Sequence, residues 1–322
     1  MDKELLLSLH DLSVKYPTRA GILNGVSNVD LDIYKGEVLG LVGESGCGKS
    51  TMGRAIMRLI QPPGYIDGGQ IIFDGRDLMT YSQEEMRDLR GQRISLIFQD
   101  PMTSLNPVQR VVDHIAEAIW VHEGKSSKTS TRTRAAKLVD RLGVTHERLD
   151  DFPHQLSGGM RQRVMIGLAL ALKADLIIAD EPTTSLDVIV EAQFLDLLKE
   201  LQHDYGLTIL LITHNIGVVA EIADRVAVMY AARLMELANA QTLFDKPLHP
   251  YTQALLASVP NIKLVGDDLK IMQGSPPDLI NPPPGCRFHP RCSQAFERCA
   301  EETPPFEEIH PGHYAACWLY AK

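Results

Sequence analysis

One segment of this sequence, Gly43-Glu44-Ser45-Gly46-Cys47-Gly48-Lys49-Ser50-Thr51, constrains the fold more than any other. It follows the apolar run 38–42 and precedes a helical pattern, which is the order of a phosphate-binding loop. In such a loop the backbone N–H groups and the helix N-terminus point at phosphate oxygens. We expect Lys49 to neutralise the β and γ phosphates and Ser50 to offer a hydroxyl to Mg²⁺. The segment predicts a nucleoside triphosphate site, with a glycine-rich turn that merely caps a helix as the alternative.

Composition narrows the class of protein. The 322 residues are 44% apolar, so the chain can bury a sizeable core. With 41 acidic against 32 basic residues, the net charge of -9 argues against a broad nucleic-acid-binding surface. Residues 1–7 do not have the pattern of a secretory signal, so we expect the chain to stay in the cytoplasm. The longest apolar stretch, 166–179, is broken by Lys173 and Asp175, so other chains would have to hold the protein at a membrane.

The order of apolar runs predicts an α/β fold. Buried parallel strands separated by helical patterns are expected at residues 38–42, 94–98, 176–179 and 208–212. Alternating segments indicate a small antiparallel sheet, at 5–12, 26–33 and 70–73. Strand signals stop between about residues 100 and 163, where we expect a helical insert. Its basic stretch 125–134 is interpreted as a solvated connection or a helix start, with a phosphate or lipid contact as the alternative.

The composition changes near residue 246. Prolines become frequent, and four of the five cysteines follow. We therefore predict a core domain, residues 1–245, and a C-terminal extension, residues 246–322. The extension is too irregular to bury a core of its own, so it should need docking onto the core domain or a staple.

Polar residues at strand ends complete the predicted chemistry. Asp180 and Glu181 end an apolar strand at the sheet edge where α/β proteins bind ligands. Asp180 is placed to hold Mg²⁺ through its water shell, and Glu181 to polarise the water that attacks the γ-phosphate. His214 ends another strand and is a candidate donor to the γ-phosphate. Taken alone, the acid pair is also compatible with a helix N-cap before Pro182, and His214 or Gln99 with an ordinary strand end.

A second glycine-rich helix start, Ser157-Gly158-Gly159, repeats the pattern of an anion site at a helix N-terminus. One phosphate group in one subunit does not need both sites. Two subunits that face head to tail, each completing the other's site, explain the pair of motifs. The alternative is a turn in which Ser157 caps the helix.

These residues together resemble the ATPase subunit of an ATP-binding-cassette transporter, over about residues 5–236. The resemblance implies a P-loop NTPase core with an antiparallel β subdomain and a helical subdomain. Residues 43–51 match the Walker A loop, Asp180 the Walker B aspartate, Glu181 the catalytic glutamate and His214 the switch histidine. The implied enzyme is a transport-coupled ATPase.

The resemblance also implies roles for residues outside these motifs. Tyr16 is similar to the aromatic residue that stacks on adenine, and Gln99 to the Q-loop glutamine that contacts Mg²⁺ and reports to the membrane subunits. Segment 157–159 matches the signature motif that reaches the partner's ATP, and Ser185-Leu186-Asp187 matches the D-loop. The predicted cofactor-binding residues are Tyr16, Gly43, Ser45, Gly46, Cys47, Gly48, Lys49, Ser50, Thr51, Gln99, Ser157, Gly158, Gly159, Asp180 and Asp187. The predicted catalytic residues are Lys49, Gln99, Glu181 and His214, and the predicted Mg²⁺ ligands are Ser50, Gln99 and Asp180.

Two positions, Met160 and Asn215, depart from the common pattern, and Cys47 is a further residue of interest. Met160 replaces the usual glutamine of the signature motif and resembles the peptide-importer branch. Asn215 follows His214 where aspartate is more usual, which leaves open how tightly the switch loop is held. Cys47 is a small filler in the phosphate loop, and we expect Lys49 and the helix N-terminus to lower its pKa.

The chemical state of the four cysteines in the extension is a separate question. The spacing of Cys286, Cys292, Cys299 and Cys317 is not that of most zinc modules, and disulfides, free thiols and a metal site all stay open from the residues alone. Segments 249–256 and 285–292 resemble the extension of dipeptide and oligopeptide importer ATPases, in which four cysteines are associated with a [4Fe-4S] cluster. The resemblance therefore implies a cluster on these cysteines, with zinc as the alternative.

The function implied by the resemblance is ATP hydrolysis that powers uptake of dipeptides or oligopeptides. The implied partners are two transmembrane permease subunits, a second homologous ATPase subunit or a second copy of this chain, and an extracytoplasmic solute-binding protein, with no nucleic acid. The chain would be peripheral, on the cytoplasmic face of the membrane. Nickel or another small solute as cargo is one alternative, and a soluble cassette ATPase outside transport is another. Whether the cysteine site is structural or redox-regulatory stays open.

Overall fold

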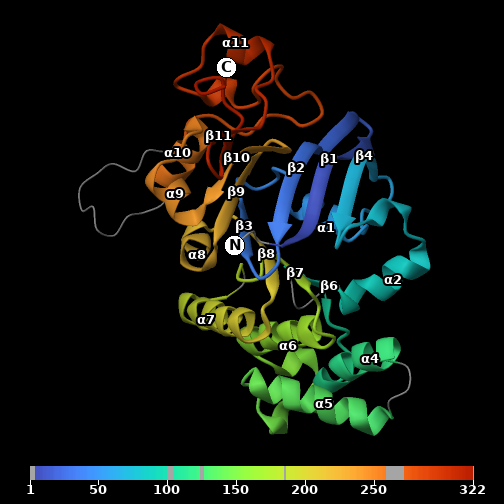
Figure 1. The fold of residues 1–322 in the computed structure, drawn as a ribbon. Coiled ribbons are helices and arrows are strands. Elements are labelled where there is room, and N and C mark those ends of the chain that lie inside the picture. Colours follow the sequence, from blue (N-terminus) through green and yellow to red (C-terminus); the bar gives the residue numbers. More distant parts are fainter. Residues whose placement is uncertain (1–3, 100–103, 124–126, 185, 259–271, 322) are drawn as a thin grey trace. The chain divides into compact units, whose positions relative to one another are not determined.

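The computed structural model describes residues 4–99, 104–123, 127–184, 186–258 and 272–321. The chain divides into two compact units (Figure 1). The first unit consists of residues 1–79 and 211–322, and the second of residues 80–210. The boundary falls inside strand β8 (Thr208–Thr213).

An antiparallel sheet with the strand order β2-β1-β4-β5 forms part of the first unit. Its strands are β1 (Leu5–Thr18), β2 (Gly21–Tyr34), β4 (Tyr65–Phe73) and β5 (Arg76–Asp77). The predicted small antiparallel sheet is therefore confirmed. Its strands are longer than the apolar alternation indicated, because polar residues continue the ladder, as where Lys15 pairs with Asn24.

The other strands of the first unit have the order β11-β12-β10-β9-β3-β8. β3 (Val38–Val42) is buried along its whole length and pairs in parallel with β9 (Arg225–Tyr230). β10 (Arg233–Asn239) pairs antiparallel with β9. Helix α1 (Lys49–Ile56) follows β3, and helix α8 (Ile216–Ile222) follows β8. This arrangement places the predicted phosphate loop between β3 and α1.

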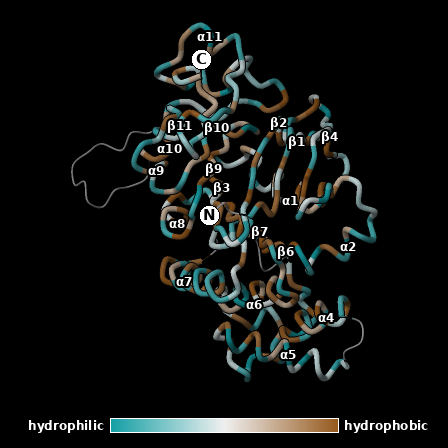
Figure 2. Tube along the Cα trace, viewed as in Figure 1, coloured by the Kyte–Doolittle hydropathy of each residue, from teal (hydrophilic) through white to brown (hydrophobic). Residues whose placement is uncertain are grey.

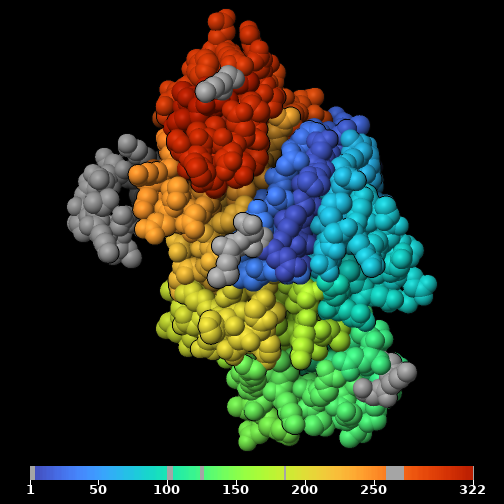
Figure 3. Space-filling view, viewed as in Figure 1, coloured from blue at the N-terminus to red at the C-terminus, as the bar shows by residue number. Residues whose placement is uncertain are grey.

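The C-terminal extension docks onto this sheet. After α9 (Ala240–Asp245), the chain forms α10 (Pro250–Ala257), α11 (Glu297–Glu301), β11 (Glu307–His310) and β12 (His313–Ala315). β12 pairs antiparallel with β10, and Tyr251 and Phe288 are buried in one apolar cluster with Tyr230. The extension is drawn in orange to red in Figure 3. Of the two expectations for the extension, docking or a staple, the strand pairing shows docking. The strands β11 and β12 were not predicted, because such short segments carry no apolar alternation.

The second unit contains strands in the order β8-β7-β6, with β6 (Ile94–Ile97) parallel to β7 (Leu176–Asp180). β7 is buried throughout. The helices are α2 (Gln83–Gln92), α4 (Val111–Glu123), α5 (Lys128–Arg141), α6 (Gly158–Leu170) and α7 (Val188–Tyr205). Hydrophobic (brown) and hydrophilic (teal) residues both occur along α4 and α5 in Figure 2. Ser127 caps α5, so the basic stretch begins a helix, as expected. None of the helices in the described ranges is both long and apolar enough to span a bilayer.

Candidate nucleotide-binding site

The glycine-rich loop in the first unit has the conformation that a phosphate loop requires. Lys49 is buried, and its Nζ donates to the carbonyl oxygens of Gly43 at 2.8 Å and Glu44 at 3.0 Å. Gly48 has a φ of +109°, and a β-carbon there would overlap the carbonyl oxygen of Gly25. Only glycine fits such a position without strain. The loop therefore wraps around the side chain of Lys49, and its outer side is left for a ligand.

The outer side of the loop is open. Ser45 and Gly46 are exposed, and apart from the neighbouring residues in the chain no atom of the described residues lies within 4 Å of the place where a β-carbon of Gly46 would stand. Ser50 and Thr51 are half-buried in the first turn of α1. The helix N-terminus and the exposed tip together fit an anionic ligand. These positions agree with the predicted ATP site, and the individual binding roles stay predictions.

Cys47 differs from its expected behaviour. Its side chain is buried, and its Sγ lies 3.8 Å from the Nζ of Lys49. Burial raises the pKa of the Cys47 thiol, and this effect exceeds the lowering by Lys49. The expectation of a lowered pKa was therefore wrong, because burial cannot be read from the neighbouring charges.

Tyr16 and His214 also belong to the first unit. The Tyr16 ring lies where β-carbons at Gly25 and Gly64 would stand, so these two glycines make room for the ring. His214 is exposed at the end of β8. Asn215 caps α8, since its Oδ1 accepts from the N–H of Gly217 at 3.0 Å. The departure at position 215 thus keeps a side chain that can hold the start of this helix.

The second unit brings Gln99 and Glu181 together. Gln99 follows β6 and Glu181 follows β7, and Gln99 Nε2 donates to Glu181 Oε2 at 3.0 Å. Thr184 Oγ1 donates to the same oxygen at 3.0 Å. Asp180 is buried at the end of β7. Parallel strands end at one sheet edge, which explains why residues 82 positions apart meet.

The predicted signature segment begins α6. Ser157 is the N-cap, and its Oγ accepts from the N–H of Met160 at 3.3 Å. A β-carbon at Gly159 would lie 2.7 Å from Cγ1 of Val190, so glycine permits close packing against α7. Asp187 caps α7, with Oδ1 accepting from the N–H of Val190 at 2.9 Å. Ser185 of the predicted D-loop lies outside the described residues.

The four cysteines of the extension line one small cavity, together with His249 and Phe288. Burial raises the pKa of Cys286 and Cys292, and raises that of Cys317 to about 11. The neighbouring sulfurs add to the rise at all three thiols. Across the described ranges, no group of three or more His, Cys, Asp or Glu side chains is arranged so that it could hold a metal ion.

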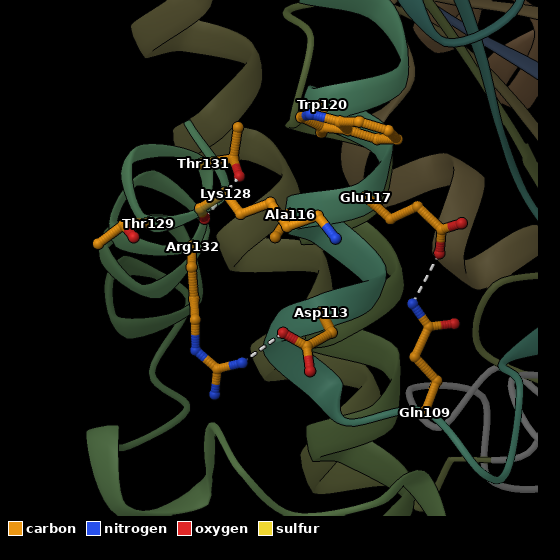
Figure 4. Close-up of a pocket in the computed structure, with 9 residues that line it drawn as sticks. All are labelled: Gln109, Asp113, Ala116, Glu117, Trp120, Lys128, Thr129, Thr131 and Arg132. Carbon is orange, nitrogen blue, oxygen red and sulfur yellow. Dashed lines mark hydrogen bonds and ion pairs between the residues drawn. The ribbon is translucent and has the colours of Figure 1, made fainter. Parts of the chain in front are cut away.

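A further cavity, of about 540 Å³, lies between α4 and α5 in the second unit (Figure 4). Several of the polar and charged side chains that line it bond with one another. Arg132 bonds with Asp113, and Gln109 Nε2 donates to Glu117 Oε2 at 2.7 Å. None of the predicted site residues lines this cavity.

Comparison with family models and solved structures identifies the class of protein to which this chain belongs. The model of the ABC transporter family matches residues 26–184, and that of the oligopeptide/dipeptide transporter C-terminal region matches residues 235–299. A solved dimeric ATP-binding cassette in a post-hydrolysis state, bound to ADP and Pi, has a TM-score of 0.67 at 27% identity. That match covers 73% of this chain and 99% of the other. The fold and the site define an ATP-binding-cassette ATPase.

Relatives that match nearly the whole chain identify the branch of the family. The oligopeptide transport ATP-binding protein OppD of Bacillus subtilis (strain 168) is 46% identical over 98% of this chain and 88% of its own length. The dipeptide transport ATP-binding protein DppD of the same organism is 46% identical over 98% of this chain and 95% of its own. This chain belongs to the ABC transporter family, in the branch of the oligopeptide and dipeptide transport ATP-binding proteins. The resemblance predicted from the sequence is confirmed.

Proposed function

We propose that this chain is the subunit that hydrolyses ATP in an ABC importer of dipeptides or oligopeptides. The observation that carries the proposal is the match of the whole chain, core and extension together, to peptide-transport ATP-binding proteins. The buried Lys49 in a loop open at its tip supports the ATP-binding part. Nickel or another small solute is the alternative cargo, because the proposed task of this subunit is hydrolysis and not the binding of cargo.

The proposed reaction assigns a role to each predicted site residue. Residues 43–51 would hold the triphosphate through backbone N–H groups and Lys49, and the predicted ligands of Mg²⁺ would be Ser50, Gln99 and Asp180. Glu181 takes a proton from the attacking water, and Gln99 and Thr184 orient its carboxylate. His214 donates to the γ-phosphate. When bound, Mg²⁺ would supply positive charge to offset the negative charge that develops on the phosphate oxygens.

The proposed assembly has several chains. Residues 157–159 reach the ATP of a second ATPase subunit, which is a homologous chain or another copy of this one. The known dimeric cassette structure supports a pairing of this kind. Two permease subunits form the channel, a solute-binding protein delivers the peptide, and this chain works at the cytoplasmic face of the membrane. Closure of the ATPase pair then drives the change of access in the permease.

We further propose that the four extension cysteines hold a [4Fe-4S] cluster, with zinc as the alternative. A cluster needs four thiolates, and four cysteine side chains line one cavity here, although they are not arranged around a metal position in the described structure. Iron and labile-sulfide analysis after anaerobic purification tests the assignment. About four irons per chain support the cluster, and a zinc-only result rejects it. The rates of ATP hydrolysis by reduced and by oxidised samples of an iron-loaded protein are then compared, which tests whether the site regulates hydrolysis.

The transport proposal is tested by the partners of the chain. Native membranes are solubilised gently, the tagged chain is purified, and co-purifying proteins are identified by mass spectrometry. Two multispanning permeases and a second cassette support the importer. The solute-binding protein is then assayed with peptides and with nickel. Ribosomal or DNA-repair partners without a membrane protein would leave the ATPase and reject transport.

A further inference from the structure

The side chain of Glu44, inside the phosphate loop, is held by the C-terminal extension. Arg291 donates from its two terminal nitrogens to the two carboxylate oxygens of Glu44, at 2.7 Å and 3.0 Å. The Arg291 side chain is 6% exposed and that of Glu44 25%. Such a two-pronged pair fixes direction as well as charge. The first residue after Gly43 in the loop is therefore oriented by a residue 247 positions away.

Arg291 is itself immobilised. Its Nε donates to the carbonyl oxygen of Gln273 at 3.0 Å, and a terminal nitrogen donates to the hydroxyl of Tyr230 at 3.2 Å. An arginine guanidinium is always charged in proteins, so Arg291 brings a full positive charge to Glu44. Arg291 directly precedes Cys292, one of the four cysteines that line the cavity of the extension. The guanidinium is thus held at a fixed place between the cysteine region and the phosphate loop.

Tyr251 makes a second contact with the same loop residue. Its hydroxyl accepts the backbone N–H of Glu44 at 3.0 Å. The Tyr251 ring is fully buried, with its centroid 4.5 Å from that of Tyr230 and 5.3 Å from that of Phe288. Burial raises the pKa of Tyr251, so the phenol stays neutral. The extension therefore holds both the main chain and the side chain of Glu44.

We propose that Arg291 and Tyr251 are positioning residues of the phosphate loop, which hold Glu44 in the conformation that binds ATP and neutralise its charge. The proposal rests on the proposed ATP-binding role of residues 43–51. An unpaired carboxylate beside the triphosphate would repel it, and the loss of either contact would free the first turn of the loop. The carbonyl of Glu44 also accepts from Lys49, so a displaced Glu44 would disturb the lysine that contacts phosphate.

The test measures affinity for a fluorescent ATP analogue with Mg²⁺ on the purified full chain, and KM and kcat for ATP. For Arg291→Gln we expect the Kd and KM to rise about tenfold, within the usual range of coupling between sites, with kcat largely kept. The double variant Glu44→Gln with Arg291→Gln should recover most of the affinity, because it removes the unpaired charge. Tyr251→Phe, which keeps the buried ring, should weaken binding by a few-fold. Arg298→Gln, an exposed arginine of the extension paired with Glu302, is the matched control and should bind as the wild type does.

Each outcome decides the question. Rescue by the double variant supports the charge argument, since damage to folding alone would not be repaired by a second substitution. An Arg291→Gln chain that is folded by circular dichroism and binds ATP with wild-type affinity overturns the proposal and leaves the proposed function intact. A double variant as weak as Arg291→Gln alone also overturns it. A wild-type chain that binds no ATP would instead overturn the proposed function, and the positioning role with it.

Discussion

Glu181 adopts a backbone conformation that its side chain does not favour. Its φ is 46°, in the left-handed region. Such a conformation persists when the surrounding contacts determine it, and it is frequent at active sites. Here Gln99 and Thr184 both donate to Oε2 of the Glu181 carboxylate. The carboxylate of Glu181, the proposed base, is therefore oriented by side chains of the protein itself.

The substitution Glu181→Gln tests this assignment. A glutamine keeps the size and a hydrogen-bond acceptor but has no basic carboxylate, so we expect kcat to fall by about 10²–10⁴ while ATP still binds. Phosphate release measures the first effect, and retention of ATP on the purified protein measures the second. Glu200→Gln, at an exposed position of α7, should hydrolyse ATP at the wild-type rate. Unchanged hydrolysis by Glu181→Gln would refute the proposed role.

Cys47 gives a prediction of pH dependence. Burial raises the pKa of its thiol, so at pH 8 a smaller fraction is thiolate than for an ordinary cysteine. We expect its alkylation by iodoacetamide to be slow at pH 8 and still to accelerate with pH above pH 9, and MgATP to slow it further. Mass spectrometry of the peptide that contains Cys47 measures the rate for this residue alone. The chain unfolded in guanidinium is the reference, and equal rates in both states would contradict the prediction.

At the scale of elements, Asn215 explains how α8 starts. Its side chain accepts from Gly217, and its own N–H donates to Thr213 Oγ1 at 3.0 Å. We expect Asn215→Ala to lower the free energy of unfolding by about 1 kcal/mol, the usual cost of a lost N-cap. Asn215→Asp should retain the cap and the ATPase activity. Denaturant titration checks the first expectation, and a full loss of hydrolysis in Asn215→Asp would refute the second.

Elements with a local sequence signal could be predicted, and those made by distant pairs could not. β3 and β7 were predicted to within one residue, because polar or glycine-rich segments bound their apolar runs. The meeting of Gln99 and Glu181 follows from two parallel strands that end at one edge. No local pattern connects Glu44 with Arg291, and β12 has only three residues. These contacts depend on tertiary packing, which a single sequence does not display.

For the molecule as a whole, one buried carboxylate contributes to the attachment of the C-terminal extension. Glu236 of β10 is fully buried, and its Oε1 accepts from the N–H of Leu248 at 2.7 Å and from His313 Nε2 at 2.7 Å. Its Oε2 accepts from the N–H of His249 at 2.9 Å. A buried charge is tolerated only when donors of this kind surround it. Glu236 thus joins the start of the extension and its last strand to the core sheet.

The substitution Glu236→Gln should therefore loosen the whole extension. A glutamine has one acceptor oxygen, so at least one of the buried donors would face an NH₂ group, and we expect a loss of about 2–4 kcal/mol in the free energy of unfolding. Limited proteolysis should then cut the extension faster than in the wild type. Glu297→Gln, at an exposed position of α11, should change neither quantity. Because Arg291 and Tyr251 belong to the extension, Glu236→Gln should also weaken ATP binding, although Glu236 does not touch the phosphate loop directly. Wild-type stability and affinity in Glu236→Gln would show that the extension is held by its apolar cluster alone.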